Sequence, residues 1–142
     1  MRIEHVKINL EKRKSITGLG YALGMPASNE QISCAESKLK VKFPEQVKLF
    51  YKMYNGITID NPHLVVYPLE NLVIDNNSII HFARINHTCE LGLDAAKMNE
   101  ANQWNIITIS DGFLITLTFA SFWSNKIWAW IDNQRAIWCD EP

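Results

Sequence analysis

The chain has 142 residues, of which 47% are hydrophobic and 20% are charged, and its net charge is −1. This size and composition are typical of one globular domain and exclude a disordered, collagen-like or coiled-coil chain. The longest uncharged apolar run, residues 112–125, is too short to span a bilayer, and the N-terminus has no apolar signal stretch. We therefore expect a single cytoplasmic domain over residues 1–142, without a membrane partner.

Charge is distributed unevenly along the chain. Residues 1–14 carry a net charge of +3 and residues 15–54 carry +2, whereas residues 55–142 carry −6. An acidic C-terminal half argues against nucleic-acid binding there, because phosphate contacts need clustered lysine or arginine. It suits a basic protein partner, and it equally suits a solvated surface that keeps the domain in solution.

The first half of the chain predicts two helices. The basic N-terminal run, residues 1–14, alternates with apolar residues and predicts a surface strand or a frayed end. A helix is predicted after Ser28, because Ser28 and Gln31 can cap each other's backbone amides. A second helix is predicted from Pro44, whose missing N–H is harmless in a first turn, to a stop at Asn55-Gly56. Apolar residues recur at helical spacing in both: Ile32, Ala35 and Leu39, then Val47, Phe50, Tyr51 and Tyr54.

The second half predicts mainly strands. Branched residues favour strands at 64–67, 78–85, 105–110 and 113–118, and Asp111-Gly112 favours a tight antiparallel hairpin between the last two. A last helix is predicted from Thr118, and a short terminal strand at 136–139. These elements predict an α+β fold, with helices packed against a mainly antiparallel sheet. Six apolar residues share one face of the last helix: Phe119, Phe122, Trp123, Ile127, Trp130 and Ile131.

No catalytic, cofactor-binding or metal site is predicted. The chain has no GxSxG elbow and no nucleotide-binding glycine pattern, and its three cysteines lack CxxC spacing and are expected to be reduced thiols. His81, His87 and Cys89 could be drawn as metal ligands, but their spacing matches no common ligand pattern. A hydrogen-bonded structural histidine is the preferred interpretation of His81.

The tryptophans are concentrated at the C-terminal end. Four of the five, Trp123, Trp128, Trp130 and Trp138, lie in the last twenty residues. On a helical wheel Trp128 lies about 100° or more from the apolar face, which predicts an exposed side chain beside acidic residues. Such a residue can anchor a protein interface, and the alternative is that Trp128 covers the edge of the core.

Residues 27–56, ASNEQISCAESKLKVKFPEQVKLFYKMYNG, resemble the N-terminal motif of the SUKH superfamily, the Smi/Knr-type family. In that motif a capped helix with an acid is followed by a linker ending in proline and a second helix ending in Asn-Gly. Residues 67–72 and 79–86 are similar to later segments of the family, and Lys40 stands where the family often has glycine. The matching positions are Ile32, Glu36, Leu39, Phe43, Pro44, Phe50, Tyr51, Asn55 and Gly56.

The resemblance implies a binding protein rather than an enzyme. Bacterial members of the superfamily resemble immunity proteins that bind a cognate toxin domain, often a basic nuclease, and the expected partner is such a toxin. The alternative is a regulatory scaffold of the Smi/Knr cell-wall-synthesis type, and a third hypothesis is an enzyme with an unrecognised site. We expect a monomer or weak dimer without direct nucleic-acid binding. The candidate partner-binding residues are Asp60, Asp75, Glu90, Asp94, Glu100 and Trp128.

Overall fold

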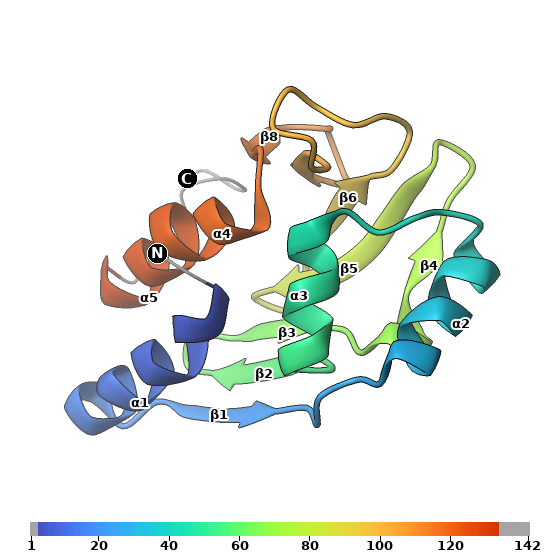
Figure 1. The fold of residues 1–142 in the computed structure, drawn as a ribbon. Helices are drawn as coiled ribbons and strands as arrows, with labels where there is room; N and C mark the ends of the chain where they lie inside the picture. Colours follow the sequence, from blue (N-terminus) through green and yellow to red (C-terminus); the bar gives the residue numbers. More distant parts are fainter. Residues whose placement is uncertain (1–2, 134–142) are drawn as a thin grey trace.

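In the computed structural model, which describes residues 3–133, an eight-stranded sheet has helices packed against one face (Figure 1). The strands are β1 (Gly20–Leu23), β2 (Ile57–Asp60), β3 (Leu64–Val66), β4 (Val73–Ile74), β5 (Ile79–Ile85), β6 (Cys89–Asp94), β7 (Ile106–Thr108) and β8 (Leu114–Thr116). The helical segments are η1 (Ile3–His5), α1 (Val6–Thr17), α2 (Asn29–Leu39), α3 (Glu45–Met53), η2 (Leu69–Asn71), α4 (Phe119–Ser121), η3 (Phe122–Ile127) and α5 (Trp128–Asn133).

Every strand pairing in the described residues is antiparallel. The order is β1-β2-β3-β5-β6-β7-β8, and β4 pairs with the first half of β5 while β3 pairs with the second half. A register shift between His81 and Ala83 separates these two halves. The predicted α+β class is therefore confirmed, as is the β7–β8 hairpin, in which Gly112 has a φ of +68°.

The prediction for the N-terminal residues is wrong, because they form a helix. The buried side chains of η1 and α1 are Ile3, Val6 and Leu10, whose spacing of three and four residues is helical, while Ile8 is 64% exposed. The helix ends at Gly18, which has a φ of +79°. Helix α1 leads into β1, which was also not predicted and which extends the sheet beside β2.

The predicted α2–α3 helical pair forms, but α3 ends at Met53 with Tyr54 in an extended conformation, so the predicted stop through a left-handed residue at Asn55-Gly56 is wrong. Ser28 Oγ accepts the N–H of Gln31, and Gln31 Oε1 accepts the N–H of Ser28, so that the capping box is complete. The last turn of α2 ends at Lys40, which adopts the left-handed conformation that glycine prefers. Glu36 is buried and accepts the N–H of Phe43, which fixes the linker between the two helices.

Replacing Ser28 with alanine is expected to lower the free energy of unfolding by about 1 kcal/mol, because an N-cap hydrogen bond is lost. Urea unfolding of the variant and the parent protein measures this difference. Ser33→Ala, at an exposed position inside the same helix, is the matched control and should be neutral or slightly stabilising. Equal losses in the two variants would contradict a capping role for Ser28.

The last helical region packs beside α3 and completes the hydrophobic core. All six residues of its predicted apolar face are buried, which confirms that prediction. The chain runs as α4, a π-helical turn η3 and α5, and Figure 1 shows this region and α1 on one side of α3, with α2 on the other. The strand predicted at 136–139 lies outside the described residues.

Candidate functional site

The sheet has one face that no helix covers in the part of the chain that the structure describes (Figure 1). In β2, Ile57 and Ile59 are buried, whereas Thr58 and Asp60 are exposed. The pairing register extends this alternation across the sheet, because paired residues point to the same face. We call this surface the helix-free face, and its residues are Thr58, Asp60, Val65, Val73, Ile79, His81, Arg84, Glu90, Gly92, Asp94, Ile107 and Leu114.

An apolar strip crosses the helix-free face. Val73 at one end is 59% exposed and Leu114 at the other end is 48% exposed. Between them, Gly92 leaves room for two isoleucines, since a Cβ there would lie 2.4 Å from Ile79 Cγ2 and 2.6 Å from Ile109 Cδ1. The strip consists of Val73, Ile79, Ile107, Ile109 and Leu114, and His81 is paired between Val73 and Gly92.

Four of the five acidic residues predicted to bind a partner lie on or beside this face. Asp60 ends β2, Glu90 and Asp94 belong to β6, and Asp75 follows β4. Glu100 is exposed in the β6–β7 loop and lies apart from the strands. The described strands contain no lysine, and Arg84 is their single arginine. The structure thus gathers carboxylates that the sequence placed only in the same half of the chain.

Glu90 is part of a hydrogen-bonded cluster. Its Oε2 accepts the hydroxyl of Tyr67 at 2.8 Å and lies 3.8 Å from Nη1 of Arg84. Burial, followed by the hydrogen bond to Glu90, raises the pKa of Tyr67 to about 12, so the phenol keeps its proton at neutral pH. Glu90 therefore helps to hold β3, β5 and β6 together, in addition to contributing charge.

Asp75 also has an internal role. Its Oδ1 accepts the N–H groups of Asn77 and Ile79 at 2.8 and 3.1 Å, and its Oδ2 lies 3.2 Å from Nε2 of His81. The hydrogen bond from Ile79, more than the other contacts, lowers the pKa of Asp75, which keeps the carboxylate ionised at neutral pH. The predicted structural role of His81 is consistent with this hydrogen bond.

The expected exposure of Trp128 is wrong. Its side chain is 6% exposed, and its ring lies 5.3 Å from that of Trp123. The guanidinium of Arg13 lies 4.6 Å from the ring centroid and makes a double hydrogen bond to Asp132, with both N···O distances at 2.9 Å. Helix α1, which was not predicted, therefore covers the tryptophan, and Trp128 offers no surface to a partner.

The residues once considered for metal binding do not form a site. In residues 3–133 no group of three or more His, Cys, Asp or Glu side chains could hold a metal ion. Over the same residues no helix is long and apolar enough to cross a membrane.

The cysteines differ in their oxidation state. Cys34 is free and exposed, but Cys89 is disulfide-bonded, so the expectation of three reduced thiols is wrong for Cys89.

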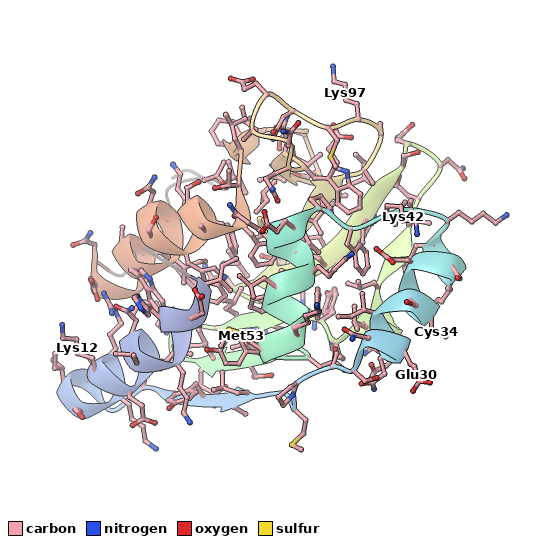
Figure 2. The ribbon with its side chains drawn as sticks, viewed as in Figure 1. Lys12, Glu30, Cys34, Lys42, Met53 and Lys97 are labelled. Atoms are coloured by element: carbon pink, nitrogen blue, oxygen red, sulfur yellow. The ribbon has the colours of Figure 1, made fainter. Side chains whose placement is uncertain are left out.

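Basic residues gather on the helical side of the molecule, opposite the acidic face. Figure 2 shows Lys12 on α1 and Lys42 after α2, both at the outer surface of the helical layer. The protein is therefore polarised, with a carboxylate-rich sheet face and a lysine-rich helical side. The basic residues on or between the first three long helices are Lys7, Lys12, Arg13, Lys14, Lys38, Lys40, Lys42, Lys48 and Lys52.

A second candidate surface is a shallow groove between α2 and η2. Its lining includes Cys34, Lys38 and Glu70, and Nζ of Lys38 donates to the Glu70 carbonyl at 3.3 Å. The groove carries one ammonium and one carboxylate, so its charge favours neither a basic nor an acidic partner. The helix-free face has the clearer chemical preference.

Sequence reasoning missed Tyr67, Arg84 and the apolar strip as parts of the surface. The placing of polar His81 and Arg84 among the apolar residues of β5 was a detectable signal, because it sets these two residues apart from the neighbours that form the core. Strand β6 was not predicted, since Gly92 and three nearby acids resemble a loop.

Residues 26–139 match the sequence model of the SMI1 / KNR4 family (SUKH-1). The chain belongs to this family. The match covers the segments that carried the resemblance and begins after α1 and β1, which lie outside it. No curated protein matches the chain. Membership supports a role of the toxin-immunity type or the Smi/Knr type, and members of the family are generally non-enzymatic.

Proposed function

We propose that this protein is an immunity protein that neutralises a basic toxin domain by binding it through the helix-free face. The observation that carries the proposal is the concentration of carboxylates beside an exposed apolar strip, on a sheet face that no described helix covers. Family membership supports the same class of function.

Charge explains why the partner should be basic. Four carboxylates lie on or beside this surface, which carries one arginine, so a positively charged domain is attracted from a distance and a polyanion is repelled. Nuclease domains carry positive charge because they hold phosphates. A nuclease toxin is therefore the partner class that fits best, and the apolar strip would supply the desolvated centre of the interface.

The test is co-purification followed by titration. The tagged protein is expressed with the products of its neighbouring genes, captured proteins are identified by mass spectrometry, and the affinity is measured at 50 and 300 mM salt. We expect a stoichiometric basic domain whose binding weakens at high salt. Capture of wall-synthesis or signalling proteins would instead favour the regulatory alternative. Binding that does not change with salt would contradict the proposal that charge attraction drives the association.

Reversing charges on this face should slow association with the captured domain. We expect Asp60→Lys combined with Asp94→Lys to reduce the association rate about 10- to 100-fold at low salt. Asp60 is exposed and Asp94 is half-buried, with its Oδ1 accepting the N–H of Ala96, whereas Asp75 and Glu90 hold the sheet and are unsuitable for this test. Stopped-flow or surface plasmon resonance measures the rate.

The matched control is Glu30→Lys combined with Glu45→Lys. These acids are exposed, produce the same change in net charge, and lie on the helical side (Figure 2 labels Glu30). A smaller effect of the control pair is expected. Equal effects of the two pairs would show that net charge, rather than the helix-free face, controls association.

A further inference from the structure

Two histidines from different hairpins stack at one end of the helix-free face. His63 lies in the β2–β3 turn and His87 in the β5–β6 turn, and their ring centroids are 3.7 Å apart with an interplanar angle of 19°. The same turns are joined by the N–H of Asn86, which donates to the His63 carbonyl at 3.0 Å. We refer to this pair of rings as the histidine stack.

The backbone beneath the stack is strained. Asn86 and His87 have φ values of 54° and 68°, the left-handed region that non-glycine residues rarely occupy. Two consecutive residues of this kind form a turn in which glycine is the preferred second residue. A histidine persists there when its surroundings stabilise it, and the stacking contact with His63 is such a stabilising interaction.

The surroundings of the stack are poor in negative charge. Arg84 from β5 and Asp60 from β2 are the charged groups that act on His63 besides His87. Glu90, the carboxylate next to Arg84, already accepts the Tyr67 hydroxyl. Nδ1 of His63 and Nε of Arg84 are both buried and have no hydrogen-bond partner in the described residues. Asp60 is therefore the main counter-charge for added protons.

We propose that the histidine stack is a proton-sensitive contact, which joins the β2–β3 and β5–β6 hairpins at neutral pH and separates in mild acid. Two neutral imidazoles stack favourably, and one proton can be tolerated. Two protons would place three positive charges, with that of Arg84, around a single free carboxylate, and like charges at this separation repel. The rings would then part and the strained turn would lose its support.

The direction of the pH effect follows from His63. Burial, then the nearby His87 and Arg84, lowers the pKa of His63 from its ordinary value, so the folded protein binds its proton less readily than the unfolded chain. The contribution of His63 to the free energy of unfolding is therefore fully present above the ordinary histidine pKa. It is lost as the pH falls through the lowered pKa of the folded protein. Mild acid should loosen these two turns first.

The contact would also regulate binding, and this consequence alone rests on the proposed function. Three of the four histidines, His63, His81 and His87, lie on the helix-free face or at its end. A proton gained by His63 would offset part of the negative charge that attracts a basic partner. The affinity should then fall between pH 7.5 and 5.

The experiment uses the protein alone, so that its outcome is independent of any partner. Imidazole resonances and the hydrogen-exchange protection of the Asn86 amide are followed by NMR from pH 8 to 5. We expect the Asn86 protection factor to fall severalfold as the pH is lowered, relative to amides in β5 and β6. Unchanged relative protection from pH 8 to 5 would overturn the proposal.

A variant separates ring stacking from charge. His87→Phe keeps an aromatic ring but cannot be protonated, so the titration of His63 should shift to higher pH and the loss of Asn86 protection in acid should disappear.

Thermal unfolding gives a second readout. Between pH 7.5 and 5, the melting temperature of the parent protein should fall by about 3 °C more than that of the variant. His5→Gln, on η1, is the matched control and should behave as the parent. Identical His63 titration in the parent and His87→Phe would also overturn the proposal.

Discussion

Replacing Phe50 with alanine is expected to lower the free energy of unfolding by about 3–5 kcal/mol, the range for truncating a fully buried aromatic residue. The side chain is 0% exposed, and its ring lies 5.2 Å from Tyr51, 4.8 Å from Phe119 and 6.2 Å from Trp123. It joins α3 to the last helical region behind the sheet. The cavity would open between elements that the rest of the fold holds in place, so little relaxation can fill it.

Phe113→Ala is the control for this prediction. Phe113 is 49% exposed in the β7–β8 loop, and the same change there should cost less than about 1 kcal/mol. Guanidinium unfolding of both variants gives the comparison. A loss below about 1.5 kcal/mol for Phe50→Ala would mean that the aromatic cluster repacks around the missing ring.

Replacing Gly24 with alanine is expected to lower the unfolding free energy by about 3 kcal/mol, the upper range for overpacking. The added Cβ would lie 2.1 Å from the backbone oxygen of Asn55, while the N–H of Gly24 donates to the Gly56 carbonyl at 2.8 Å. Asn55 cannot easily move away, since its N–H donates to Met25 and its Oδ1 accepts the N–H of Leu69. Relief of the clash would separate β1 from the end of α3.

Gly112→Ala is the matched control for Gly24→Ala. Its Cβ would meet nothing within 4 Å, but its φ of +68° should still cost an alanine about 1 kcal/mol. Thermal or urea unfolding distinguishes the two. Similar losses would show that backbone conformation, and not contact with Asn55, limits the residue at position 24.

The elements predicted correctly are those with strong local signals. The capping box at Ser28 and the proline at position 44 specify helix starts through groups only a few residues apart, and both helices form. The six-residue apolar face after Thr118 also depends on spacing within one segment. Helix α1 carried a comparable signal in Ile3, Val6 and Leu10, but Ile8 between them resembled strand alternation.

The candidate surface depended on longer-range information. The sequence identified the acids as a group in one half of the chain, but residue spacing does not give the strand register that places Asp60, Glu90 and Asp94 on one face. The burial of Trp128 likewise follows from α1, whose Arg13 lies over the indole from a position more than a hundred residues earlier in the sequence. Helical periodicity within α5 contains no information about that contact.

The sequence by itself determined the family, the α+β class, the α2–α3 helical pair, the β7–β8 hairpin and the apolar face of the last helix. Each depends on residues close together in the chain, whose side chains act on the local backbone. Only the tertiary structure decided which face of the sheet remained uncovered, which carboxylates gathered there and which histidines met. Those arrangements depend on pairing between distant strands, and such pairing is selected by burial of the whole core rather than by any short segment.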